Sequence, residues 1–216
     1  MMKNLRRRPG CLNEQRRTYR MRKLAVCAAL TLSLSGCVLA PQVIQLNQEA
    51  TVTAGQLSLS RDALVRVVDD RMVDGRQPEP NELGSRGGRL AENSPLNSEN
   101  SLKDVLTTRM QNSLTQLGFG AASPLEPLKL QLSVKEFSYG CNDGMMVNDC
   151  SVRMRFELTV IDGATTFTKP YGANESRRVA TAPVKEYNEK WVNEVLDRLW
   201  QYMFNDDELR AALGVQ

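Results

Sequence analysis

The chain has 216 residues, of which 41% are hydrophobic and 25% are charged, and its formal net charge is +3. This length suits one domain with a real core plus a short additional segment. The sequence contains no histidine. Enzymes that use Ser-His-Asp or Cys-His groups, zinc sites built on histidine and histidine proton shuttles are therefore excluded. The G-x-S-x-G and S-x-x-K motifs of esterases and penicillin-binding proteins do not occur either.

The first element along the chain is a secretion signal. Two basic residues precede a short apolar run at residues 24–34, which is too short to cross a bilayer. The sequence LSGC at residues 34–37 resembles the lipidation signal of bacterial lipoproteins. This resemblance implies cleavage between Gly36 and Cys37 and acyl chains on Cys37, which anchor the protein in a membrane. The alternatives are an ordinary signal peptide with a chance cysteine, or an apolar core segment.

Residues 1–20 would make an unusually long basic region, so Met21 is the expected start of the signal, and residues 1–36 are expected to be removed. Nine of the 28 basic residues and one of the 25 acidic residues precede Cys37, which leaves 19 basic and 24 acidic residues and a net charge of about −5. The mature chain therefore lacks the basic character of a nucleic-acid-binding protein. Val38 stands where an aspartate commonly retains lipoproteins in the inner membrane, which favours the outer membrane.

Two cysteines besides Cys37 remain in the mature chain. Cys141 and Cys150 flank a polar loop between two strand-like segments, and a disulfide between them suits an oxidising compartment. The alternative is a pair of free or metal-binding thiols. Because no histidine or further cysteine can complete a tetrahedral site, the sequence predicts no metal and no cofactor.

The first half of the mature chain is poor in regular patterns. Residues 37–57 are expected to be a lipidated tether that provides reach and ends in a first strand, ahead of a single domain at residues 58–216. Residues 63–68 predict a buried strand that runs into a polar turn. The stretch 75–100, rich in proline and glycine, is expected to be a mobile loop or irregular excursion.

A helix is expected from Ser101, its cap, to Gly118. Its apolar residues follow helical spacing, and the opposite, polar side carries Lys103, Arg109, Gln111, Asn112 and Gln116.

Two alternating strands follow, at residues 128–135 and at residues 152–160. After the first of these ranges the alternation changes phase at Phe137, which predicts a bulge or an aromatic pair on the outer face. Asp162 and Gly163 predict a two-residue turn into a third strand over 164–179, interrupted near Pro170.

A second helix is expected from Val184, and a short last helix capped by Asn205 ends at Leu213. This order of elements predicts an α+β fold. Specifically, we expect a two-layer sandwich with a mostly antiparallel sheet and two main helices packed on one face.

Three groups of side chains raise the question of a site. Asp69, Asp70 and Asp74 are carboxylates in a turn, but their spacing misses a calcium loop and favours an ordinary solvated turn. The sequence RGGR, with Arg86 and Arg89, could hold a phosphate or lipid headgroup, although a flexible charged loop is the simpler interpretation. Trp191 and Tyr187 are expected in the core, which leaves two surface candidates for a partner, Trp200 and Tyr202.

Several features together resemble the YajG-type family of Gram-negative lipoproteins. They are the lipidation signal, the strand before Asp69-Asp70-Arg71, the LGSR sequence at residues 83–86, the helix that ends in Leu-Gly-Phe and the C-terminal helix with Trp191. The resemblance spans nearly all of the mature chain. It implies an envelope lipoprotein and supplies no activity, and the Cys141–Cys150 loop is not part of the family's general pattern.

The expected function is that of a non-enzymatic binding or assembly accessory, facing the periplasm from the outer membrane. Its partner would be an envelope protein, peptidoglycan or lipid. One alternative is a hydrolase that uses only carboxylates, with Asp69, Asp70 and Glu82 as candidates; it needs two of them about 5–9.5 Å apart. The other is a structural module that dimerises through a sheet edge or the Cys141 loop.

Overall fold

The computed structural model describes residues 40–53, 55, 57–87, 94–121, 123–142, 147–180 and 183–216. The chain divides into two compact units, Met1–Ala40 and Pro41–Gln216, and the described helices and strands all belong to the second. The predicted signal peptide with its start at Met21, the cleavage site at Gly36 and Cys37, and Arg89 lie outside the described residues.

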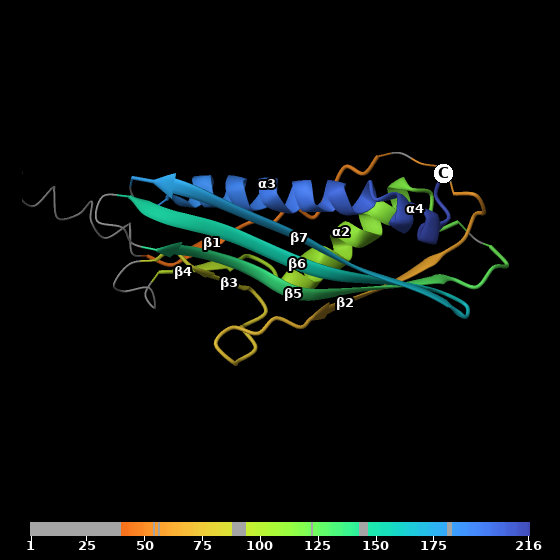
Figure 1. The fold of residues 1–216 in the computed structure, drawn as a ribbon, viewed down its shortest axis with the longest axis horizontal. Helices are drawn as coiled ribbons and strands as arrows, with labels where there is room; N and C mark the ends of the chain where they lie inside the picture. Colours follow the sequence, from red (N-terminus) through yellow and green to blue (C-terminus); the bar gives the residue numbers. More distant parts are fainter. Residues whose placement is uncertain are drawn as a thin grey trace, which may run out of the picture. The chain divides into compact units, whose positions relative to one another are not determined.

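The described residues of this unit form a mixed seven-stranded sheet and three helices, so the predicted α+β class is confirmed (Figure 1). The strand order is β1-β4-β3-β5-β6-β7, and β2 pairs with β5 outside this path. Most of the sheet is antiparallel, and the pairs β1–β4, β2–β5 and β3–β5 are parallel. The elements are β1 (Gln42–Ile44), β2 (Ala63–Asp69), β3 (Glu82–Ser85), β4 (Pro95–Ser98), α2 (Leu102–Gln116), β5 (Leu128–Asn142), β6 (Asn148–Asp162), β7 (Thr165–Val179), α3 (Lys185–Phe204) and α4 (Asp207–Leu213).

The long strands β5, β6 and β7 form an antiparallel meander. The predicted change of phase in β5 is confirmed as an irregularity between Val134 and Glu136. The turn after β6 lies one residue later than expected, because Asp162 still pairs with Thr165. Gly163, whose φ is +56°, is therefore the first residue of the two-residue turn. The expected interruption of β7 is wrong. Pro170 continues the strand because β7 is an edge, where the missing N–H costs no ladder hydrogen bond.

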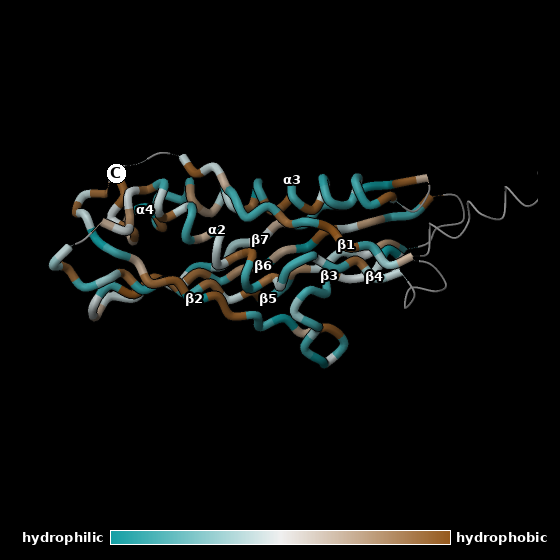
Figure 2. Tube along the Cα trace, turned by 180° about the vertical axis from the view of Figure 1, so that it is seen from behind, coloured by the Kyte–Doolittle hydropathy of each residue, from teal (hydrophilic) through white to brown (hydrophobic). Residues whose placement is uncertain are grey.

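One edge of β5 is shared by two shorter strands. β2, which is mostly hydrophobic apart from Arg66 and Asp69 (Figure 2), pairs with Leu128–Val134, and β3 pairs farther along with Tyr139 and Gly140. The prediction of a buried strand is wrong for most of β2, since Val67 is its one buried residue and Leu64 is 52% exposed.

Arg71 fills the break between β2 and β3. It is 2% exposed, forms a two-pronged ion pair with Asp69 at 2.8 Å and donates from Nη1 to the carbonyls of Glu82 and Phe137. The buried guanidinium thus satisfies main-chain carbonyls of both β3 and β5 between the points where β2 and β3 pair with β5.

The stretch 75–100 is more ordered than its composition indicated. It contributes β3 and β4, which pair with each other and bury Leu83 and Leu96. The expectation of an irregular loop is wrong for these two strands, because four-residue strands with one large buried apolar side chain each carry too little pattern for detection.

The helices begin and end close to the predicted residues. Ser101 caps α2 by accepting from the Asp104 N–H at 3.1 Å, and Val184 is the N-cap of α3. The cap of α4 is Asp206, one residue after the predicted Asn205. Among the described residues, no helix is both long and apolar enough to cross a membrane.

The segment after residue 41 is part of the folded domain. Four of its apolar residues are buried: Ile44, Leu46, Ala50 and Val52. β1 adds to the sheet beside β4, and Leu57 forms a bridge with Val215 near the C-terminus. The expectation of a tether over residues 37–57 is therefore wrong for the described residues from Gln42 onward.

Candidate functional site

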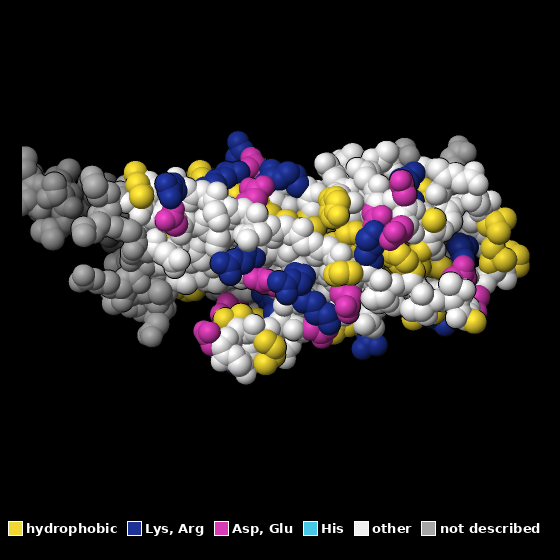
Figure 3. Space-filling model, in the orientation of Figure 1, with side chains coloured by type: hydrophobic (Ala, Val, Ile, Leu, Met, Phe, Trp, Pro, Cys, Tyr) yellow, Lys and Arg dark blue, Asp and Glu magenta, His cyan; other side chains and the backbone are white. Residues whose placement is uncertain are grey.

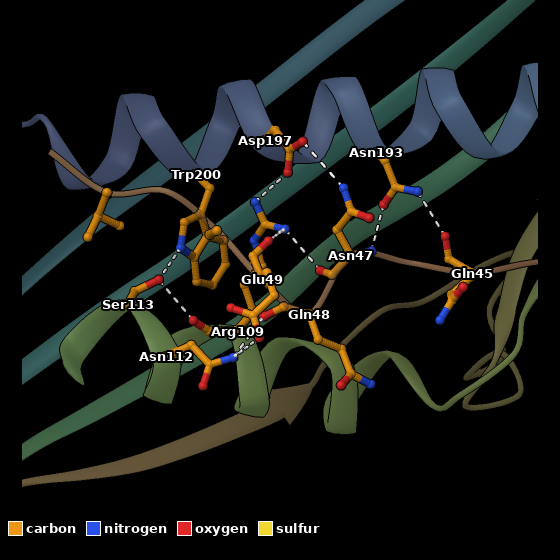
Figure 4. A network of polar contacts seen from close by, with 12 residues as sticks. Gln45, Asn47, Gln48, Glu49, Arg109, Asn112, Ser113, Asn193, Asp197 and Trp200 are labelled. Carbon is orange, nitrogen blue, oxygen red and sulfur yellow. Dashed lines mark hydrogen bonds and ion pairs between the residues drawn. The ribbon is translucent and has the colours of Figure 1, made fainter. Parts of the chain in front are cut away.

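The extended segment of residues 45–52 is held between α2 and α3 by polar side chains from both helices (Figure 4). We call this arrangement the clamp. On α3 its residues are Glu189, Asn193 and Asp197, which are four positions apart and therefore lie in one row along the helix. On α2 they are Arg109, Asn112 and Gln116, whose spacing of three and four likewise places them on one side.

Two amide side chains of the clamp bind the backbone of the segment. Asn193 accepts from the Asn47 N–H at 2.7 Å and donates to the Gln45 carbonyl at 2.8 Å. Gln116 donates to the Ala50 carbonyl at 2.7 Å and accepts from the Val52 N–H at 3.4 Å. Each amide thus bridges main-chain groups two residues apart, as a neighbouring strand would.

Arg109 is the centre of the clamp. It is 1% exposed, and its Nη1 donates to the carbonyls of Asn47 and Glu49, both at 2.9 Å. Nη2 pairs with Asp197 at 2.6 Å, and the guanidinium lies 5.0 Å from the centre of the Trp200 ring. Burial lowers the pKa of Arg109, and the contact with Asp197 opposes that effect. The prediction that Arg109 belongs to a polar outer side of the helix is wrong, because backbone carbonyls and one carboxylate satisfy its charge in the interior.

A second buried chain of hydrogen bonds fixes the start of β1. The Tyr139 hydroxyl donates to Asn188 Oδ1 at 2.8 Å, and Asn188 Nδ2 donates to Gln42 Oε1 at 2.8 Å. Gln42 in turn donates to the Pro183 carbonyl at 3.3 Å. Burial raises the pKa of Tyr139, so this phenol remains a hydrogen-bond donor at physiological pH.

The predicted partner-binding residues do not form one surface. Trp200 is fully buried: its indole donates to Ser113 Oγ at 2.8 Å, and its ring packs on Phe156, so the expectation of a surface tryptophan is wrong. Arg86 is 2% exposed and is therefore not part of an open charged loop. Tyr202 is 63% exposed and contacts Tyr171 edge to face. Tyr187 is partly buried and Trp191 fully buried, as predicted.

The candidate catalytic acids are held in separate ion pairs. Asp69 binds Arg71, Asp70 binds Lys135 at 3.0 Å, and Glu82 binds Arg76 at 2.9 Å. The hydrogen bond from Arg76 lowers the pKa of Glu82, which opposes a role as a general acid. Within the described ranges, no three histidine, cysteine or acidic residues are grouped to hold a metal ion.

The solvent-facing side of β5 and β6 carries charges of both signs. Figure 3 shows Lys and Arg side chains among Asp and Glu along the middle of one face. Lys135 contacts Glu157, and Arg155 contacts Glu136, with side chains that are 30–65% exposed. Such mixed pairs are typical of a solvated sheet face and contribute little to stability.

Cys141 and Cys150 lie directly opposite each other in β5 and β6 and form a disulfide with an S–S distance of 2.08 Å. The predicted pairing is therefore confirmed. The bond closes the base of the loop that connects the two strands.

A family model described as "uncharacterized lipoprotein" matches residues 49–214. The crystal structure of protein XCC0632 from Xanthomonas campestris, assigned to the DUF330 family, has 12% identity and a TM-score of 0.43, with 74% of this chain and 99% of that chain covered. The crystal structure of an uncharacterized protein has 17% identity and a TM-score of 0.41, with coverages of 72% and 95%. A search of the curated proteins finds no match. The match over most of the chain shows that this protein belongs to the YajG family of uncharacterized lipoproteins.

Proposed function

We propose that the protein is acylated at Cys37, faces the periplasm from the outer membrane and acts there as a binding or assembly accessory without catalytic activity. The observation that carries this proposal is the clamp. It joins residues 45–52, which begin eight positions after Cys37, to α2 and α3 through hydrogen bonds between side chains of the helices and the main chain of the segment. A domain fastened in this way at its N-terminal end suits attachment to a membrane through acyl chains on Cys37.

Two further observations support this proposal. The disulfide between Cys141 and Cys150 suits an oxidising compartment such as the periplasm. The candidate acids Asp69, Asp70 and Glu82 are each neutralised by a different cation, so none is poised for the acid–base work of a hydrolase. A binding role therefore fits the described residues better than hydrolysis.

We also infer a two-layer arrangement in which α2 and α3 cover the same face of the sheet. Direct contacts between the helices support it, namely Trp200 with Ser113 and Arg109 with Asp197. The packing of Trp200 on Phe156 of β6 joins this helix pair to the sheet.

The test begins with the protein purified from membranes. Mass spectrometry of its N-terminal peptide is expected to show acyl chains on Cys37, and the Cys37→Ala variant is expected in the soluble fraction. A photo-crosslinking residue in place of Tyr202, the exposed aromatic residue of α3, then tests partner binding, with the same residue at Leu125, which is 41% exposed, as the control.

Capture of one envelope component from position 202 alone, lost in the Cys37→Ala background, supports an anchored accessory. An unmodified N-terminal peptide contradicts the proposed anchor. Acylated protein that captures nothing specific from either position contradicts the proposed partner role of Tyr202.

A further inference from the structure

The distance between the proposed anchor and the folded domain is short. Five residue steps separate Cys37 from Gln42, the first residue of β1. An extended chain covers at most about 3.6 Å per residue, so these steps span at most about 18 Å. The reach expected of a long tether is therefore absent, and the end of the domain that carries β1 must stay near the membrane.

The position of Gln42 in the domain is fixed. β1 pairs with β4 from Gln42 onward, and the Gln42 side chain takes part in the buried chain of Tyr139 and Asn188. Ile44 is fully buried two residues later. Release of more chain would require breaking these contacts first, so the length of chain from the membrane is set at the start of β1.

Several elements meet at the end of the sheet where β1 begins. Figure 1 shows the start of α3, the last residues of β7 and the connected ends of β5 and β6 at the end of the sheet where β1 begins. Gln42 contacts the Pro183 carbonyl, and Asn148 at the start of β6 pairs with Val179 at the end of β7.

Among the residues that the structure describes at this end, three large apolar side chains are exposed: Val43 by 46%, Val147 by 42% and Val184 by 62%. Val184 occupies the N-cap of α3 and makes no side-chain capping bond. A polar residue is strongly preferred at that position, so the valine breaks a local rule of helix formation. Exposed apolar residues occur at other places too, among them Leu125, but only at this end does the five-residue link from Cys37 enter the domain.

We propose that Val43, Val147 and Val184 form a face that rests on the lipid headgroups of the membrane in which Cys37 is anchored. This inference rests on the proposed acylation of Cys37. The headgroup region is roughly 5–7 Å thick on each side of the hydrocarbon core, so a link of at most about 18 Å leaves the domain little room to rotate away. In this orientation the N-terminus of α3 points toward the membrane, and the opposite end of the sheet, with Leu125 and the turn after β6, points into the periplasm.

The test uses the full acylated protein in vesicles of phosphatidylethanolamine and phosphatidylglycerol. A fluorophore is attached to Val184→Cys in one sample and to Leu125→Cys in another; both positions are exposed, so the substitutions leave the core intact. The native Cys141 and Cys150 are bonded to each other and do not react with the label. A quencher attached to the lipid headgroups is expected to reduce the emission at position 184 and not at position 125.

A matched variant carries a flexible Gly/Ser insertion after Ala40. About 20 inserted residues have a root-mean-square span of roughly 25 Å, longer than the native link. This insertion is expected to abolish quenching at position 184 while the protein still floats with the vesicles. Val43→Cys provides a second label at the same end.

The outcomes separate the two proposals. Acylated protein that floats with the vesicles but shows equal quenching at positions 184 and 125 overturns the membrane-facing surface and leaves the anchor in place. Quenching at position 184 that survives the insertion also overturns the role of the short link. Protein without acyl chains that does not float overturns both proposals.

Discussion

At the scale of single residues, two buried arginines determine how irregular segments are held. Arg109 binds two carbonyls of residues 45–52, and Arg71 binds the carbonyls of Glu82 in β3 and Phe137 in β5. In both cases a planar guanidinium with several donors satisfies backbone groups that no strand can reach. Lysine has one compact charged group and cannot make the same set of bonds.

We therefore expect Arg109→Lys to lower the free energy of unfolding by about 2–3 kcal/mol, because the carbonyls of Asn47 and Glu49 lose their donor. Urea unfolding with an unchanged slope measures this loss. The matched control is Arg155→Lys, a side chain that is 65% exposed, for which a change of at most about 0.5 kcal/mol is expected. Equal effects of the two substitutions would show that the clamp contributes no stability.

Asp206 gives the domain a pH-dependent contact. Burial raises the pKa of its carboxyl, but hydrogen bonds from Lys169 at 2.7 Å and Tyr171 at 2.6 Å outweigh this and hold the pKa below its usual value. A lowered pKa stabilises the fold above the unfolded-state value of about 3.9, and this stabilisation disappears as the pH falls through the folded-state value.

We expect Asp206→Asn, which retains a capping oxygen for α4, to be less stable than the native chain at pH 6 and to approach it as the pH falls below about 4. Urea unfolding of both proteins from pH 6 to pH 3 measures the difference. Exposed Glu126, paired with Lys129, supplies the control Glu126→Gln, with little change across the same range. A difference that does not vary with pH would contradict the assignment of this contact to the charge on Asp206.

Some single-residue features of the site could be predicted from the sequence, and others could not. The cap at Ser101 and the pairing of Cys141 with Cys150 were predictable because each depends on local spacing. The roles of Arg109 and Asn193 were not, because their partners lie about 60 and 150 residues away along the chain. The polar residues at positions 189, 193 and 197 form a row next to the apolar side of α3, and this row indicates a polar contact surface. The sequence does not indicate which segment of the chain that surface binds.

At the scale of elements, the disulfide joins the long strands β5 and β6 at one end of the sheet. In the chain-entropy model a loop of this size contributes about 2–3 kcal/mol. We expect the double substitution of Cys141 and Cys150 by alanine to lower the free energy of unfolding by about that amount without changing the fold. Urea unfolding with and without a reductant tests this: the reductant should destabilise the native chain and leave the double variant unaffected. A reductant effect on both proteins would contradict the assignment to this bond.

The long elements were predictable and the short ones were not. β5, β6 and α2 have enough alternating or helical positions for their pattern to stand out, and they appear close to the expected residues. β1, β3 and β4 have three or four residues each. Their structure depends on pairing with one another across the sheet, and such nonlocal pairing leaves almost no trace in a short sequence.

At the scale of the whole molecule, the anchor and the fold are expected to be separable at residue 40. A chain that begins at Ala40 keeps β1 and the clamp, so its thermal and urea unfolding should match those of the full chain. A chain that begins at Thr53 loses the buried side chains of Ile44, Leu46, Ala50 and Val52. Large aliphatic side chains contribute about 1.5–3 kcal/mol each, so this loss is comparable to the whole stability of a domain.

We therefore expect the chain beginning at Thr53 to be unfolded or partly folded by circular dichroism. If it instead unfolds as cooperatively as the chain beginning at Ala40, residues 42–52 are a dispensable appendage, and the proposed fixed distance from the membrane is wrong as well.

The way the segment is fastened also determines how the protein would respond to mechanical load. A pull applied at Cys37, the proposed anchor, would act along β1 and the segment that follows, because both come shortly after Cys37 in the chain. The ladder to β4 lies across the direction of that pull, so it would be loaded in shear, and the bonds to Asn193, Arg109 and Gln116 hold the segment that follows. Resistance to forced unfolding depends on the unfolding rate, and a shear arrangement requires several of these bonds to break together. We therefore expect the clamp to add mechanical strength in the direction from which a membrane would pull on the proposed anchor.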